Sequence, residues 1–145
     1  MNGRRLLLSG SDRRRLAAQA VAAFPEECCG ILVGRQFDES DTVVSRLVAT
    51  ANESDDRERR FEIAPREILS AVRGSRATGE QIVGFYHSHP DGSARLSSVD
   101  RKHAWPGVSY LIVAEGGAVA SWRCGADGAI ETEMVVDAAP SEPHP

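Results

Sequence analysis

The sequence predicts an α/β (α+β) domain in which a mixed central β-sheet is flanked by helices. Helical and strand-like patterns alternate in the order strand, helix, strands, helix, strands, which favours this class. A length of 145 residues is enough for one hydrophobic core, and 41% hydrophobic with 26% charged residues is typical of a globular chain. We therefore expect a single domain over residues 1–136 and a frayed tail over residues 137–145.

The first helix is expected over residues 11–24, directly before a proline. Asp12 is its predicted N-cap, because a short polar side chain can accept a hydrogen bond from the first turn. One face of this helix carries three apolar side chains, namely Leu16, Ala20 and Ala23.

The second helix is expected over residues 65–76, because proline is tolerated in a first helical turn. Residues 52–60, NESDDRERR, lack apolar periodicity and predict a solvated loop. Short apolar runs bounded by turn residues predict strands at residues 4–8, 28–34, 42–51, 80–89, 108–115, 118–125 and 129–136.

Charge and composition narrow the function classes. Seventeen Lys and Arg against 21 Asp and Glu give a net charge of −4, which offers no general attraction to nucleic acid or to an anionic membrane. The apolar run near the N-terminus is too short for a signal peptide, and no run is long enough for a membrane span. We therefore expect a cytoplasmic protein with no nucleic-acid or membrane partner. The odd number of cysteines (Cys28, Cys29 and Cys124) fits that location, and we expect Cys28 and Cys29 to be small buried side chains, with redox or metal roles as the alternatives.

Two of the four histidines, His87 and His89, lie one residue apart at the end of a predicted strand. Residues i and i+2 of a strand face the same side, so both imidazoles can reach one point. Pro90 ends the strand, and a short helix that begins near residue 97 can return Asp100 as a third ligand. Two histidines and one carboxylate leave a fourth position open, as in catalytic zinc sites, although Fe, Co or Ni would also accept this set.

Parts of this pattern also have structural explanations. Ser97 and Asp100 fit a helix-capping motif, in which the serine accepts a backbone hydrogen bond. His103 and His144 need no function. The complete set of His, His, Pro, Ser and Asp at fixed offsets is too specific to arise readily by chance.

The stretch HSHPDGSARLSSVD (87–100) resembles the H-x-H-P-x(6)-S-x(2)-D signature of the JAMM (MPN-plus) zinc metalloproteases, the family of the proteasomal and signalosome deubiquitinating subunits. The resemblance covers about residues 4–136, and the stretches PEECCG and FEIAP are most similar to the compact bacterial members. It implies the JAMM fold, one catalytic zinc ion and hydrolysis of a peptide or isopeptide bond. The substrate bond is often at the C-terminus of a ubiquitin-like protein.

The resemblance also implies two catalytic residues. The family places a glutamate three residues before a glycine, and Glu27 occupies that position here. It would act as the general base, and Ser97 would donate a hydrogen bond to the oxyanion. Glu26 is the competing carboxylate, but successive strand residues face opposite sides, so only one of the two would face the metal.

One departure from the family bears on the substrate. Only about seven residues separate Asp100 from the strand near Val108, so the substrate-gripping insertions of the ubiquitin-chain enzymes are absent. We therefore expect an extended tail as substrate, added as a strand along a sheet edge. Similar compact bacterial proteins act on ubiquitin-like sulfur carriers, which predicts cleavage after a C-terminal Gly-Gly.

Other function classes stay open. A catalytically weak MPN scaffold would be expected to lack metal ligands, and a general small-peptide metallopeptidase would show no preference for Gly-Gly. A zinc nucleoside deaminase has a broadly related sheet architecture but would carry H-x-E and P-C-x-x-C motifs, which this sequence lacks. A DNA-associated role, which a similar H-x-H-P motif in another bacterial family brings to mind, is disfavoured by the net charge. The sequence makes no prediction of oligomeric state.

Overall fold

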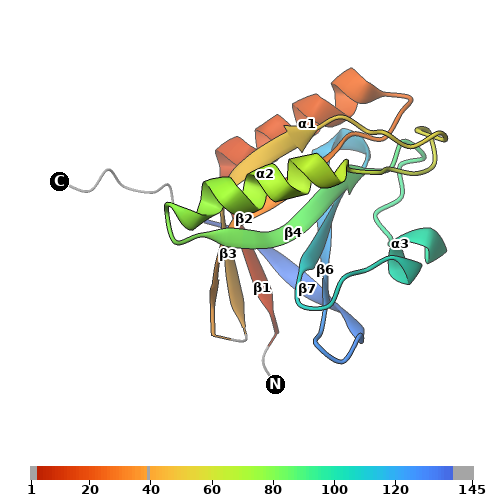
Figure 1. Ribbon diagram of the computed structural model, residues 1–145. Helices are drawn as coiled ribbons and strands as arrows, with labels where there is room; N and C mark the ends of the chain where they lie inside the picture. Colours follow the sequence, from red (N-terminus) through yellow and green to blue (C-terminus); the bar gives the residue numbers. More distant parts are fainter. Residues whose placement is uncertain (1–2, 39, 139–145) are drawn as a thin grey trace.

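The computed structural model describes residues 3–38 and 40–138 of the chain (Figure 1). Strands and helices follow in the predicted order. The strands are β1 (Arg5–Leu8), β2 (Cys29–Phe37), β3 (Asp41–Thr50), β4 (Gln81–Ser88), β5 (Ser109–Val113), β6 (Val119–Cys124) and β7 (Ile130–Asp137). The helices are α1 (Gly10–Ala23), α2 (Pro65–Arg76) and α3 (Ser98–Lys102), and η1 (Glu115–Gly117) is a short 3-10 turn.

The strands form one mixed sheet, as predicted, and this sheet closes into a barrel in the order β1-β3-β2-β4-β5-β6-β7. Strand β1 is parallel to both β3 and β7, β4 is parallel to β5, and the remaining pairs are antiparallel. Each described strand therefore has a hydrogen-bonded neighbour on both sides. The closure is incomplete along β3, because β1 pairs only with residues 41–43 of that strand, so the rest of β3 has a hydrogen-bonded neighbour on one side only.

Two hydrophobic clusters lie on the two faces of the sheet. Adjacent residues of β2 alternate between them, because Leu32 belongs to the first cluster and Ile31 to the second. Helix α1 adds its buried Leu16 to the first cluster, and α2 adds Ala71 to the second. The helices thus cover different faces, and β4 runs toward the side of the molecule where α3 lies (Figure 1).

The start of α1 differs from the prediction. Ser9 is the N-cap, and its side chain accepts a hydrogen bond of 3.0 Å from the backbone N–H of Asp12. Asp12 lies inside the first turn, where its negative charge is favourable near the helix N-terminus. The helix therefore begins one residue earlier than expected, because an upstream serine supplies the cap.

Other boundaries also differ, and the largest difference is at β2, which ends at Phe37 instead of residue 34. The predicted strand over residues 108–115 ends at Val113, because η1 follows with Gly116 at a φ of 76°, a conformation that favours glycine. Asp137, placed in the tail by the sequence, belongs to β7, and the next backbone N–H donates to the carbonyl of Leu8. Residues 139–145, with His144, lie outside the described part of the chain. No helix among the described residues is long and apolar enough to cross a membrane.

Candidate metal and active site

The end of β4 carries the two histidines into the interior. His87 is the penultimate residue of β4, and His89 follows the strand directly, with its backbone N–H still bonded to the carbonyl of Val113 at 3.1 Å. The side chain of His87 is fully buried and that of His89 is 8% exposed. Their rings approach to 4.8 Å between centroids, so both point to the same place, as the i, i+2 spacing predicts.

Helix α3 carries the third side chain to the same place. Ser97 is its N-cap: the Ser97 Oγ accepts from the Asp100 backbone N–H at 3.0 Å, and the Asp100 Oδ2 accepts from the Ser97 backbone N–H at 3.0 Å. This reciprocal pair is a capping box, which the sequence offered as the structural explanation. It also fixes the direction of the Asp100 carboxylate, so the capping role and the candidate ligand role are compatible.

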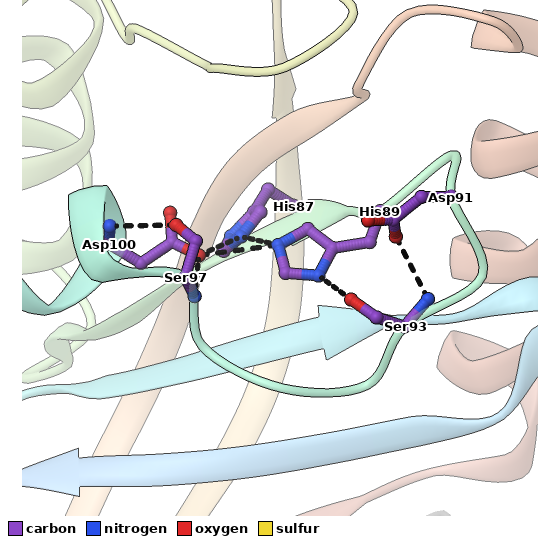
Figure 2. Close-up of polar contacts among 6 residues, drawn as sticks. All are labelled: His87, His89, Asp91, Ser93, Ser97 and Asp100. Carbon is purple, nitrogen blue, oxygen red and sulfur yellow. Dashed lines mark hydrogen bonds and ion pairs between the residues drawn. The ribbon is translucent and has the colours of Figure 1, made fainter.

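The three candidate ligand atoms form a nearly equilateral triangle (Figure 2). The two Nε2 atoms are 3.0 Å apart, and they lie 3.1 Å (His87) and 3.2 Å (His89) from the Asp100 Oδ2. Ligands at 2.0–2.1 Å from a tetrahedral ion are separated by about 3.3 Å. The triangle is therefore close to the size that one such ion requires, and these residues form a cluster that could hold a metal ion.

Burial and mutual contacts shift the pKa values of the cluster. Burial raises the pKa of the Asp100 carboxyl, but its hydrogen bonds with both imidazoles outweigh burial and hold that pKa well below its usual range. Burial lowers the pKa of His87. Burial acts in the same direction on His89, but there the hydrogen bond and charge of Asp100 prevail, and the pKa of His89 is raised. An ionised carboxylate beside a neutral His87 is the protonation state in which these residues bind metals.

Glu27 lies on the segment between α1 and β2. Its backbone N–H donates to the carbonyl of Arg57 at 2.7 Å, and its carbonyl accepts from the Asn52 side chain at 3.0 Å. The next residue, Cys28, forms two hydrogen bonds with Ser88. Its backbone N–H donates to the Ser88 Oγ at 2.8 Å, and its carbonyl accepts from the Ser88 backbone N–H at 3.1 Å. These contacts hold the Glu27 segment against the end of β4, at the residue that separates the two histidines in the sequence.

The two neighbouring glutamates have different environments. Glu26 pairs with the exposed Arg57 at 3.2 Å, whereas Glu27 is only 5% exposed. Neither residue lies in a strand, because β2 begins at Cys29. The alternation argument that we used to separate them is therefore wrong in its premise, and loop contacts make the separation instead.

The Glu27 carboxyl is poised for proton exchange. Loss of hydration on burial raises its pKa to about 8, the charges of Asp100 and Asp91 act in the same direction, and His89 opposes them. Its Oε1 is buried and has no hydrogen-bond partner among the described residues. A carboxyl with a free oxygen and a pKa near neutrality is suited to general acid–base catalysis.

Three neighbours of the histidines were not found from the sequence. Phe61 stacks on the ring of His87, with centroids 4.4 Å apart and planes 20° from parallel. Ser93 Oγ lies 3.0 Å from the Nδ1 of His89 (Figure 2), and Ser88 anchors the Glu27 segment. Phe61 lies in the FEIAP stretch, which carried only a family resemblance, and no local pattern connects it with residue 87.

Two hollows adjoin the cluster. The first, the Asp100 groove, has a volume of about 590 Å³ and is lined by Asp100, Phe61, Trp105 and the polar loop around residues 53–55. The second, the His89 groove, has a volume of about 620 Å³ and lies against His89 and α1. Each groove is thus lined by a different member of the cluster.

The sequence profile of the prokaryotic homologues of the JAB domain matches residues 11–125, and the chain belongs to this family. With its barrel, its His-x-His strand end and its returning aspartate, it is a JAMM-type hydrolase.

Individual relatives cover nearly the whole chain. A protein named desampylase from Haloferax volcanii is 30% identical over 142 residues, which is 94% of this chain and 100% of the relative. A solution structure of a protein from Desulfitobacterium hafniense is similar with a TM-score of 0.80 and 32% identity, over 93% of this chain and 94% of its own. A second solution structure, from Salinibacter ruber, gives a TM-score of 0.67 and 30% identity, over 97% and 95% of the two chains.

Proposed function

We propose that this chain is a zinc-dependent peptidase or isopeptidase that cleaves after the C-terminal Gly-Gly of a ubiquitin-like sulfur-carrier protein. The observation that carries the proposal is the convergence of three ligand atoms beside a buried glutamate with a free carboxylate oxygen. Similarity to a protein named desampylase supports a substrate of the ubiquitin-like class. We also propose that the chain up to Asp137, the last residue of β7, acts as a single catalytic domain, and the cytoplasmic location stays a prediction.

His87, His89 and Asp100 are the residues that would hold the ion. Their donor set of two imidazole nitrogens and one carboxylate oxygen is that of catalytic zinc sites, and three protein ligands leave room for a reacting molecule. When bound, zinc supplies polarisation of the scissile carbonyl and a lower pKa for the attacking water. A nearby cation would also favour the ionised form of Glu27, which is the form that accepts a proton.

Glu27 and Ser97 supply the proton transfers and the hydrogen bond. Glu27 takes the proton of the attacking water and delivers it to the leaving amine, for which its unpartnered Oε1 is available. The Ser97 Oγ accepts from the Asp100 backbone N–H, so its own hydroxyl proton is free to donate to the developing oxyanion. Phe61 and Ser93 keep the two imidazoles in place.

The Asp100 groove is the site that we propose for the substrate tail. Its polar loop over residues 53–55 offers partners for an extended backbone, and the aromatic rings of Phe61 and Trp105 line it. Glycine before the cleaved bond lets the backbone approach the buried cluster most closely. The short connection between α3 and β5 leaves no segment to grip a second folded protein.

Mass spectrometry of small carrier proteins tests this proposal. Carriers with and without an extension after Gly-Gly are incubated with the zinc-loaded chain, and we expect cleavage directly after the second glycine. Replacement of that glycine by valine should abolish cleavage, because a branched side chain cannot enter beside the cluster. Efficient cleavage of unrelated peptides with no preference for glycine would instead identify a general metallopeptidase.

A further inference from the structure

The His89 groove is an apolar hollow that the proposed tail does not use. It lies between α1 and the segment that connects β5 to η1, and His89 forms part of its wall. Val21 and Phe24 stand at its rim and are unusually exposed for such large apolar side chains, at 79% and 66%. None of the described side chains that line it carries a carboxylate, an ammonium or a guanidinium group.

Position relative to the cluster decides what this groove can receive. A bond that is cleaved at the cluster has its acyl residue on one side and its amine residue on the other. Asp100 lines one groove and His89 lines the other, so a substrate that crosses the cluster enters both. If the glycine tail occupies the Asp100 groove, the residue that leaves as the amine occupies the His89 groove.

The chemistry of the two walls supports this orientation over the reverse. An extended tail of several residues brings backbone N–H and C=O groups that need partners. The α1 wall of the His89 groove offers few, because the backbone groups of a helix are already bonded to one another. Small residues such as Ala20 and Gly117 instead leave smooth apolar space, which suits an apolar side chain. A charged side chain would lose its hydration there without a compensating partner.

We infer that the His89 groove is the leaving-group pocket of the enzyme and selects an uncharged, apolar side chain on the amine side of the cleaved bond. This inference rests on the proposed function. Val21 is the residue at which this selectivity can be tested, because it lines the groove and most of its side chain faces solvent, so it can be replaced without disturbing the core.

A substrate series separates this inference from the proposed function. The carrier that is cleaved most efficiently is extended after Gly-Gly by X-Ala, where X is Leu, Ala, Lys or Asp, and kcat/KM is measured with the zinc-loaded chain. We expect Leu to exceed both Lys and Asp by at least tenfold, with Ala between them. Cleavage of all four at equal rates overturns the leaving-group pocket and leaves the proposed function intact. Cleavage of none overturns the proposed function and the pocket with it.

A charge placed on the rim gives a second readout. In Val21→Asp we expect the Leu substrate to lose at least tenfold in kcat/KM while the Lys substrate gains, so that the preference for Leu over Lys collapses. Ala18→Asp is the matched control, because Ala18 is an exposed residue of the same helix outside the groove, and it should keep the wild-type preference. Equal zinc content and thermal unfolding in the three proteins would exclude damage to the fold. The same Leu-to-Lys ratio in all three proteins would overturn the assignment.

Discussion

The burial of Glu27 predicts that the metal-free protein loses folding stability as the pH rises. The pKa of this carboxyl is about 8 in the folded protein, against 4.5 for the ordinary group. A raised pKa means that the folded state favours the protonated form. The stability that this group contributes is therefore complete below pH 4.5 and is lost as the pH rises through 8. Glu27→Gln cannot ionise and should escape that loss.

The size of the effect follows from the shift in pKa. At about 1.4 kcal/mol per unit, the shift sets an upper limit of about 5 kcal/mol on the loss above pH 8. Water that enters when the carboxylate ionises reduces this limit. We therefore expect the free energy of unfolding of Glu27→Gln, relative to wild type, to be about 2–3 kcal/mol higher at pH 8.5 than at pH 4.5.

Urea unfolding of the chelator-treated protein between pH 4.5 and 8.5 measures this difference. Glu26→Gln is the control, because Glu26 is paired at the surface with Arg57, and its effect should stay below about 1 kcal/mol throughout. A Glu27→Gln difference that does not grow with pH would refute the reasoning. In the zinc-loaded protein, Glu27→Gln should retain the metal and lower hydrolysis by about 10² or more, while Glu26→Gln should be mild.

The remaining predictions concern the metal and the barrel. Elemental analysis should find near one equivalent of zinc in the native protein and a large loss in the His87→Ala, His89→Ala double variant, and equal metal content would contradict the ligand assignment. Arg123→Met should lower the free energy of unfolding by about 3–5 kcal/mol, because it leaves the buried carboxylate of Glu133, now 3.0 Å from Arg123, without its partner. The double variant Arg123→Met, Glu133→Leu should lose less free energy of unfolding than Arg123→Met alone. A larger loss in the double variant, measured by urea unfolding, would show that the ion pair is unimportant.

Local periodicity accounts for most of what the sequence could predict. The i, i+2 spacing of His87 and His89 and the Ser97 to Asp100 offset are properties of one strand and one helix, and both hold in the structure. Element boundaries were also close, since apolar runs and turn residues mark them within one to three positions.

Contacts between distant segments could not be predicted in the same way. Closure of the barrel pairs Arg5 with Met134, and no local pattern specifies such a pair. The stacking of Phe61 on His87 and the burial of Glu27 depend on where a loop settles against the end of β4. The choice of Ser9 over Asp12 as a cap was missed for a simpler reason, since several polar residues adjoin the helix start and each is able to cap it.

The parallel pairing of β1 with β7 has a consequence for the order of events during synthesis. The metal-site residues all lie before residue 101, so they leave the ribosome well ahead of the last strand. Until Ile130–Asp137 has emerged, β1 and β6 each lack a neighbour and expose unpaired backbone groups. The nascent chain therefore passes through a stage in which the metal-site residues have emerged but the barrel is not yet closed. Chaperone capture and aggregation would compete with folding at that stage, which ends when β7 pairs with β1 and β6.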